Sequence, residues 1–211
     1  MRKHICLLLL GWICALAGCS LKNGVNITPH EINGEADLFY REALRLSANY
    51  DVDTTLKSIQ LLDSALSIDS LNPDYYGLKA KLLCELGYLD SALLVQERAD
   101  RIGAVTGEYL FQLGLFQAAK GDSVNARESF RRSNRYQMAI LKHYPDSLGA
   151  LIIQQAANAA YHGTDSFYMA DLEQIKKRFP DRLMEIEISR RVKPSSLIRQ
   201  IRLLELAPEP E

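Results

Sequence analysis

Two stretches of the chain, 34 positions apart, share one pattern of large and small residues: YGLKAKLLCELGYLDSALLVQERA at positions 76–99 and LFQLGLFQAAKGDSVNARESFRRS at positions 110–133. The pattern rests on six positions of each stretch, which are Tyr76, Ala80, Leu83, Gly87, Ala92 and Ala99 in the first and Leu110, Gly114, Gln117, Gly121, Ala126 and Ser133 in the second. At these positions large residues recur with large ones, small with small, and glycine with glycine, apart from Gln117 in place of Leu83. Self-similarity with a period of roughly 20 to 50 residues is typical of proteins built from repeated supersecondary units. We therefore expect repeated helix pairs.

The small residues of each stretch predict where two helices touch. Antiparallel helices approach closely only where side chains are small, so we expect Gly114 to face Ala126 across its helix pair. Gly87 and Gly121 are expected to end the first helix of each pair, because glycine adopts the left-handed conformation without strain. Asp122 follows the second of these glycines and offers a capping side chain to the next helix.

The pattern extends in both directions from these two stretches. Six residues define an upstream pair, with a longer turn at positions 50–54: Phe39, Ala43, Leu46, Ser58, Leu62 and Ala65. Downstream, a fourth pair that contains Ala156, Gly163 and Leu172 is offset by eight extra residues, which we assign to a prolonged helix stopped by Pro145. Tyr168 stands in the place of a small residue, so we expect this pair to pack more loosely or at a different angle.

A last helix pair is predicted at the C-terminal end. FPDRL at 179–183 echoes YPDSL at 144–148, which suggests a helix over 183–192, a turn at 193–196 and a helix over 196–206. Residues 184–188 alternate apolar and acidic side chains and would also suit a strand. We favour a helix, because a lone strand would leave its edges unpaired. Residues 207–211 are expected to form a disordered tail.

The spacing of small residues and glycine resembles that of the tetratricopeptide repeat. The resemblance covers residues 34–181 and implies an all-α fold, a right-handed α-solenoid of about four helix hairpins. Residues 182–206 would add a C-terminal capping helix pair, because a terminal repeat needs one apolar face and one solvated face. A repeat pattern of this kind fixes architecture and does not name a partner.

The resemblance also implies a partner-binding groove, since the first helices of successive tetratricopeptide units line a concave surface. Carried over position by position, it gives eight residues, here called the groove residues: Tyr40, Leu44, Lys81, Glu85, Glu108, Phe111, Leu115 and Tyr161. Aromatic side chains dominate the binding energy of many interfaces. The alternative is that Phe111 and Leu115 pack beneath a neighbouring helix, because an error of one residue in phase exchanges the two roles.

The first residues of the chain have the three parts of an export signal. Arg2 and Lys3 precede an apolar stretch at 5–17 that ends in small residues. A membrane-spanning helix needs about 20 apolar residues, so this stretch is too short to be a permanent anchor. The sequence LAGC at 16–19 resembles the lipobox of bacterial lipoproteins, in which the cysteine becomes the acylated first residue. The alternative is an ordinary signal peptide that contains a cysteine near its end.

This resemblance implies that residues 1–18 are removed and that Cys19 carries lipid. Residues 19–33 would then join the anchor to the helices as a linker rich in Asn, with Gly24 and Pro29. The mature chain would have 23 basic and 26 acidic residues, a formal net charge of −3, too mild to suggest nucleic-acid binding. Cys84 would be its one remaining thiol, so stability must come from packing without an intramolecular disulfide.

The sequence offers little catalytic chemistry. His30, His143 and His162 lie outside any close metal-ligand spacing, and there is no nucleophile elbow, phosphate-binding glycine loop or paired Cys-x-x-Cys. We therefore expect no enzymatic activity, no cofactor and no metal. Residues 176–202 carry nine basic residues against three acidic ones, and five of them form a predicted basic face: Arg190, Arg191, Lys193, Arg199 and Arg202. This face is either solvated or docks an acidic partner or anionic lipid headgroups.

Together these patterns predict a non-catalytic lipoprotein of the bacterial cell envelope that acts as a protein-protein interaction scaffold. Ser20, the residue after the anchor, favours the outer membrane over the inner one under a sorting rule of some Gram-negative bacteria. Two alternatives remain open: a module that captures short peptides, and an accessory of a cell-wall enzyme. No pattern indicates an oligomeric state.

Overall fold

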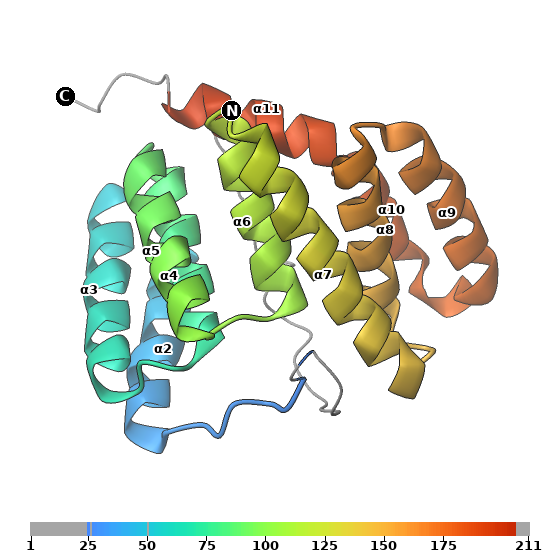
Figure 1. The fold of residues 1–211 in the computed structure, drawn as a ribbon. Helices are drawn as coiled ribbons and strands as arrows, with labels where there is room; N and C mark the ends of the chain where they lie inside the picture. The colour runs from blue at the N-terminus through green and yellow to red at the C-terminus, as the bar shows by residue number, and fades with distance from the viewer. Residues whose placement is uncertain (1–24, 26, 50, 206–211) are drawn as a thin grey trace. The chain divides into compact units, whose positions relative to one another are not determined.

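A computed structural model describes residues 25, 27–49 and 51–205 of the protein. In this part of the chain all regular structure is helical, with ten α-helices and one short 3-10 turn (Figure 1). The helices, in chain order, are α2 (Gly34–Ser47), α3 (Val52–Ile68), α4 (Pro73–Glu85), α5 (Leu89–Ile102), α6 (Gly107–Ala119), α7 (Ser123–His143), α8 (Leu148–His162), α9 (Asp165–Arg178), α10 (Leu183–Arg191) and α11 (Pro194–Glu205), and the 3-10 turn η1 (Pro180–Arg182) precedes α10.

The predicted all-α class is confirmed, and so are several predicted boundaries. The alternating segment 184–188 lies inside helix α10, so the strand alternative is wrong. Helix α7 is prolonged to 21 residues and ends two residues before Pro145. Consecutive helices pack against one another as α2 with α3, α4 with α5, α6 with α7, and α8 with α9. Cys19, the signal segment 1–18 and the tail 207–211 lie outside the described residues.

Side chains with short polar groups fix where most helices begin. A side-chain oxygen at the N-cap accepts a hydrogen bond from a backbone N–H of the first turn in seven helices, through Asn33, Asp51, Asn72, Thr106, Asp122, Ser147 and Thr164. Each such bond satisfies one of the four N–H groups that a helix start leaves without an intrahelical partner. The predicted capping role of Asp122 is confirmed, because its Oδ1 accepts from Asn125 N at 3.1 Å.

The turns after α4 and α6 have the same backbone hydrogen bonds, 34 positions apart. In the first turn the N–H groups of Leu86, Gly87, Tyr88 and Leu89 donate, in that order, to the carbonyls of Leu82, Cys84, Leu83 and Gly87. In the second turn the N–H groups of Lys120, Gly121, Asp122 and Ser123 donate, in the same order, to the carbonyls of Phe116, Ala118, Gln117 and Gly121. Gly87 and Gly121 have φ values of 87° and 86°. These are left-handed conformations that favour glycine, so the prediction that both residues end a helix is confirmed.

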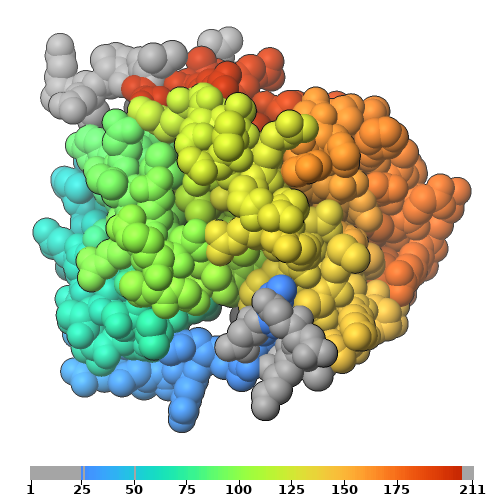
Figure 2. Space-filling view, in the orientation of Figure 1, coloured from blue at the N-terminus to red at the C-terminus, as the bar shows by residue number. Residues whose placement is uncertain are grey.

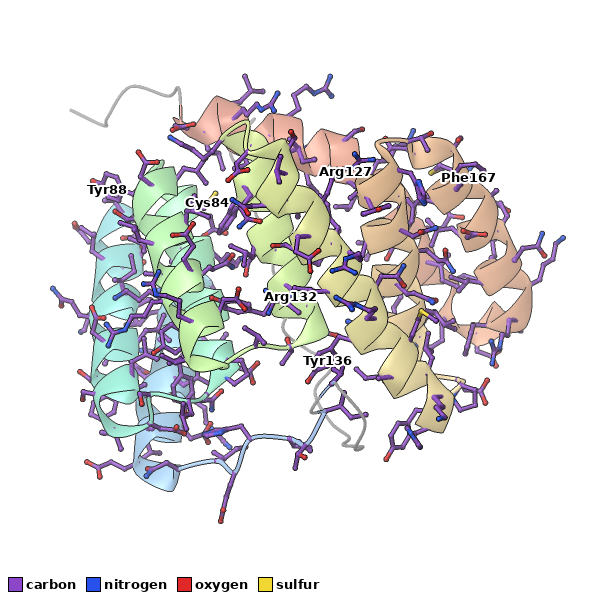
Figure 3. All side chains as sticks on the ribbon, viewed as in Figure 1. Cys84, Tyr88, Arg127, Arg132, Tyr136 and Phe167 are labelled. Atoms are coloured by element: carbon purple, nitrogen blue, oxygen red, sulfur yellow. The ribbon has the colours of Figure 1, made fainter. Side chains whose placement is uncertain are left out.

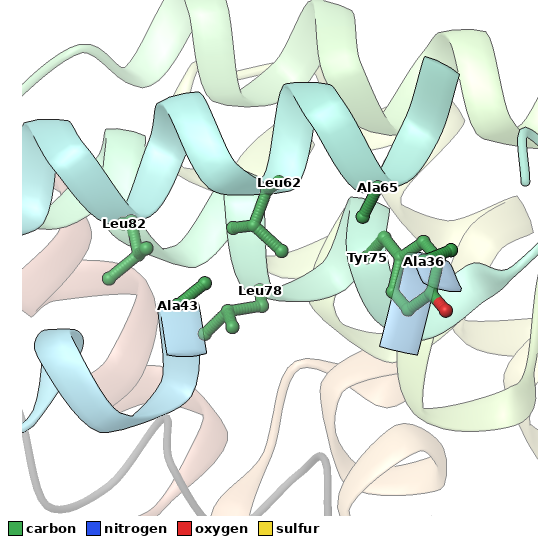
Figure 4. Packing of buried hydrophobic residues seen from close by; sticks show 7 residues of the cluster. All are labelled: Ala36, Ala43, Leu62, Ala65, Tyr75, Leu78 and Leu82. Carbon is green, nitrogen blue, oxygen red and sulfur yellow. The ribbon is translucent and has the colours of Figure 1, made fainter. Parts of the chain in front are cut away.

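The chain divides into two compact units. The α2–α5 unit contains residues 30–105 and 203–205, and the α6–α11 unit contains residues 106–202 together with the described residues up to 29. The core of the α2–α5 unit is shown in Figure 4, where side chains of α2, α3 and α4 meet. It consists of Ala36, Ala43, Leu62, Ala65, Tyr75, Leu78 and Leu82. The alanines let the helices approach closely, and the leucines and Tyr75 fill the space between them.

The α6–α11 unit is organised around the contact between α6 and α7. Nearly every residue of α6 is buried, whereas one side of α7 faces solvent and forms the yellow surface in Figure 2. A Cβ atom built on Gly114 would lie 2.6 Å from the ring of Phe130, so Gly114 faces Phe130 rather than the predicted Ala126. The two partners are one helical turn apart on the same face of α7, which explains the error.

Gly107, a second glycine of α6, also lets α6 and α7 approach each other closely. A Cβ on Gly107 would lie 2.4 Å from Nε2 of Gln137, and the Gly107 carbonyl accepts a hydrogen bond from the Ser133 hydroxyl at 2.7 Å. Ser133 is fully buried at the position that the repeat pattern assigns to a small residue. Ser129 of α7 also bonds to α6, since its hydroxyl donates to Gln117 Oε1 at 2.7 Å. Two buried serines of α7 are therefore satisfied by the backbone and side chains of α6.

Tyr168, which stands in the place of a small residue, is buried in the structure. Its side chain is only 2% exposed, and its hydroxyl donates a hydrogen bond to the Ser189 carbonyl at 3.0 Å. Burial, with a smaller contribution from Asp165, raises the pKa of Tyr168, because the phenolate would lose its hydration. The ring thus joins α9 to α10, while α8 and α9 contact each other less extensively than the helices of the other three pairs do, in agreement with the predicted looser packing.

We expect Gly114→Ala to lower the free energy of unfolding by about 1 to 3 kcal/mol, because the new methyl group overlaps the buried Phe130 ring. Thermal and denaturant unfolding of the purified protein measure the effect. Gly34→Ala is the matched control: it is also at a helical position, but a Cβ there meets no atom within 4 Å, so it should leave stability unchanged or slightly raised. Equal stability of the two variants would contradict the described contact.

Candidate functional site

The groove residues of the α2–α5 unit differ in how far they reach solvent. Leu44 of α2 is 39% exposed. Tyr40, one turn earlier, is half-buried, and its ring centroid lies 5.1 Å from that of Tyr75 at an angle of 42°. Such tilted pairs stabilise by about 0.5 to 1.5 kcal/mol beyond the burial of their area. Leu44 is therefore the groove residue of this unit that a partner can reach most freely.

Lys81 and Glu85 of α4 form a largely buried ion pair. Lys81 Nζ lies 3.3 Å from Glu85 Oε1, and the two side chains are 9% and 11% exposed. Burial raises the pKa of Glu85, and the neighbouring Lys81 charge opposes this shift. Removing two charges from water costs about as much as their attraction returns, so such a pair adds little net stability. Neither charge is presented freely to a partner.

The groove residues of α6 lie in the core of the α6–α11 unit. Phe111 is 4% exposed, with its ring centroid 5.8 Å from that of Phe130, and Leu115 has no exposed area. Glu108 is half-buried and accepts a hydrogen bond from Gln137 Nε2 at 3.0 Å. A partner could touch Phe111 or Leu115 only after movement of the surrounding helices.

Tyr161, near the end of α8, forms a cluster that the sequence pattern does not reveal. The guanidinium carbon of Arg127 lies 5.2 Å from the centroid of the Tyr161 ring, and Arg127 Nε donates to the Tyr161 carbonyl at 3.2 Å. Figure 3 shows Arg127 between α7 and α8. His162 contacts the same ring edge-on, with centroids 5.0 Å apart. The half-buried Tyr161 thus presents an aromatic surface held in place by a cation.

Four of the nine cations at 176–202 pair with acidic residues of the same unit. Lys176 Nζ lies 2.8 Å from Glu187 Oε1, and Arg178 lies 2.6 Å from Asp146. Arg190 lies 3.7 Å from carboxylate oxygens of both Glu173 and Glu187, and Arg182 pairs with Glu185. Exposed pairs of this kind contribute little to stability, but they reduce the charge that an approaching partner meets.

Three members of the predicted basic face have no ion pair within the described residues: Arg191, Lys193 and Arg199. Arg191 and Arg199 are exposed and Lys193 is half-buried. Arg191 ends α10, Lys193 lies in the turn to α11, and Arg199 is on α11. These three residues of the predicted basic face thus place positive charge in and near this turn.

Arg202 of the predicted basic face has a structural partner instead. Its Nε donates to the Ala119 carbonyl at 2.9 Å and its Nη2 to the Ala118 carbonyl at 2.7 Å, at the C-terminal end of α6. The last carbonyls of a helix have no intrahelical donor and carry partial negative charge, so a guanidinium there is favourable. The 83 residues between the two segments explain why the sequence pattern does not predict this contact.

The described residues contain no cluster of three or more His, Cys, Asp and Glu side chains placed to hold a metal ion. Cys84 is buried on α4 (Figure 3). Within the same residues no helix has both the length and the apolar character needed to span a membrane. Among the described residues, the partly exposed ring of Tyr161 and the exposed Leu44 are accessible to a binding partner.

Comparison with known proteins gives no match to a protein family, to a curated protein or to a solved structure.

We expect Arg202→Gln to lower the free energy of unfolding by about 1 kcal/mol, because the two carbonyls at the end of α6 lose a charged donor. Denaturant unfolding measures the loss. Arg199→Gln, one turn earlier on the same helix, removes an unpaired cation and should change stability by less than about 0.5 kcal/mol. A larger loss in Arg199→Gln than in Arg202→Gln would contradict the capping role.

Proposed function

We propose that the protein is a lipid-anchored scaffold of the bacterial cell envelope that binds other proteins through tetratricopeptide-like helix pairs and catalyses no reaction. The observation that carries this proposal is the repeated turn: two helix ends 34 positions apart have the same hydrogen bonds and the same left-handed glycine. A period of about 34 residues in helix-turn-helix units is that of the tetratricopeptide repeat. The proposal extends this repeat to a right-handed solenoid of about four hairpins over 34–181.

The small residues at helix contacts support the same architecture. The positions that the pattern reserves for small side chains are buried throughout the four pairs: Ala43, Ser58, Ala65, Ala80, Ala92, Ala99, Gly114, Ala126, Ser133 and Ala156. Repeats of this kind expose extended surfaces, and they are used mainly for binding. The helices α10 and α11 then serve as the capping pair, with Leu197 and Ile201 buried on one side of α11 and Arg199 on the other.

The binding surface proposed here is narrower than the eight groove residues and lies on the α2–α5 unit, where Leu44 is exposed and Tyr40 is half-buried. On the α6–α11 unit, Tyr161 and Glu108 are partly accessible, whereas Phe111 and Leu115 belong to the core. An exposed leucine beside a partly exposed tyrosine suits recognition of an apolar or aromatic segment of a protein partner.

A second candidate, docking of an acidic partner, has its own observation. Arg191, Lys193 and Arg199 lie in or near the turn between α10 and α11 and are not neutralised by neighbouring carboxylates of the described chain. An acidic protein segment or anionic lipid headgroups would complement this charge, and the attraction would fall steeply with salt. The small number of free cations makes this surface secondary to the apolar one.

Lipid attachment is tested by growing cells with an alkyne-tagged palmitate. We expect the protein to incorporate the label, Cys19→Ser to abolish incorporation, and Cys84→Ala, which removes the buried thiol of α4, to leave it unchanged. Several acyl chains at about 0.8 kcal/mol per buried methylene would hold the protein on the membrane nearly permanently. Label retained in Cys19→Ser would remove the lipoprotein part of the proposal.

Partner binding is tested by photo-crosslinking in intact cells. We expect a diazirine amino acid at position 44 to capture a distinct protein at about five times or more the yield of the same group at position 94. Leu94 is a matched control, because it is an even more exposed leucine, at 62%, on α5 of the same unit. Capture of short peptides instead of a folded protein would favour the peptide-binding alternative. Equal yields at both positions would contradict the proposed surface.

A further inference from the structure

His30, in the predicted linker, is bound to the helical domain. Its Nε2 lies 2.8 Å from both carboxylate oxygens of Asp69, which is 39 positions away in the chain. Asp69 is the C-cap residue of α3, and its side chain is 9% exposed, whereas that of His30 is 27% exposed. A ring N–H aimed between two carboxylate oxygens is a charge-assisted hydrogen bond, one of the stronger kinds in proteins.

The surroundings of this contact are acidic and poorly hydrated. Asp74, in the first turn of α4, has a pKa raised by burial, and the charge of His30 partly offsets this shift. The buried Tyr75, next to Asp74, lies in the electrostatic field of Asp69, Asp37 and Asp74. The His30 ring donates to Asp69 of this cluster, and Arg41 pairs with Asp37, so two of its carboxylates have a partner.

The segment that begins at His30 is held at both ends by the α2–α5 unit. His30 contacts Asp69, and Asn33 caps α2, with its Oδ1 accepting from the N–H groups of Glu35 and Ala36 at 3.0 Å and 3.2 Å. We call residues 30–33 the strap. The sequence pattern predicts a free linker here, whereas a histidine-carboxylate contact and a helix cap are features of a docked segment.

We propose that docking of the strap sets how far the α2–α5 unit can lie from the membrane. The contact between His30 and Asp69, here called the latch, keeps the strap docked. This inference rests on the proposed lipid attachment at Cys19. Eleven residue steps separate Cys19 from His30, a maximum span of about 39 Å, whereas fourteen steps separate it from Asn33, about 50 Å. Release of the strap therefore adds roughly 10 Å to the reach of the α2–α5 unit.

The docked state is tested with a protease that cleaves after glutamate. Glu31 is exposed and lies between the latch and the start of α2. Proteases require an extended, locally released segment. We expect His30→Ala to be cut after Glu31 at least tenfold faster than the unaltered protein, and Asp69→Asn to give an intermediate rate. His143→Ala, which changes an exposed histidine at the end of α7, is the matched control and should match the unaltered protein.

Two outcomes of the cleavage experiment overturn the inference. One is an unchanged rate in His30→Ala, and the other is cleavage of the unaltered protein as fast as that of a free peptide with the strap sequence. Thermal unfolding of each variant is recorded in parallel. A variant that unfolds at a markedly lower temperature is replaced by His30→Gln, which keeps a polar side chain and loses the imidazole.

The reach is tested on the membrane-bound full chain. A donor dye is attached to the new thiol of Lys57→Cys, at an exposed site on α3, and the vesicles contain acceptor lipids. The buried Cys84 is expected to react slowly. We expect energy transfer to the bilayer to fall in His30→Ala and not in His143→Ala. Unchanged transfer would overturn the reach-setting role. Failure of the protein to bind vesicles would overturn lipid anchoring and this role, while the cleavage result would still decide whether the strap is docked.

Discussion

The close approach of antiparallel helices at small residues is the constraint on which the rest of the structure depends. Cys84 is the one cysteine among the described residues, so no disulfide joins them, and packing must hold the helices together. The closest packing occurs where a side chain is missing, as at Gly114 against the ring of Phe130. Interiors packed to this density tolerate little change in volume. The repeated small residues are thus the part of the sequence that specifies which helices pair.

Hydrogen bonds from arginine side chains that are distant in sequence also stabilise helix ends. Two arginines donate to carbonyls at the C-terminal ends of helices far away in sequence, Arg127 to Tyr161 of α8 and Arg202 to Ala118 and Ala119 of α6, and a third, Arg178, donates to Pro145 in the loop after α7. All three contacts lie within the α6–α11 unit. Because a helix end carries partial negative charge and unsatisfied carbonyls, one guanidinium meets both needs. Much of the basic character of the C-terminal part is therefore structural.

Local features of the fold could be predicted from the sequence, and contacts between distant residues could not. Gly87, Gly121 and Asp122 act through their own conformation or through bonds to residues a few positions away, so their effects are visible in the sequence. Arg202 acts across 83 positions. Tyr168 donates a hydrogen bond to the carbonyl of Ser189, 21 positions away on α10, and the repeat pattern does not predict this contact.

The groove residues show the same limit on prediction. The repeat phase assigns Phe111 and Leu115 to a surface, but both are in the core, because residues on opposite sides of a buried helix follow the same spacing. Hydrophobic periodicity identifies a helix and its apolar positions; it does not identify which apolar positions remain uncovered. The resemblance to a repeat family therefore narrows a binding surface to a set of helices, and burial within the structure is needed to select residues.

The distribution of charge constrains how any partner can be recognised. Of the nine basic residues at 176–202, four pair with carboxylates and Arg202 caps a helix, which leaves few free cations. Long-range electrostatic steering requires a sizeable field of one sign, and this unit does not present one. Affinity would then have to come from short-range contacts at exposed apolar side chains such as Leu44. Such contacts act only once the partner is close, which is a reason for a scaffold to be confined to a membrane where its partners are concentrated.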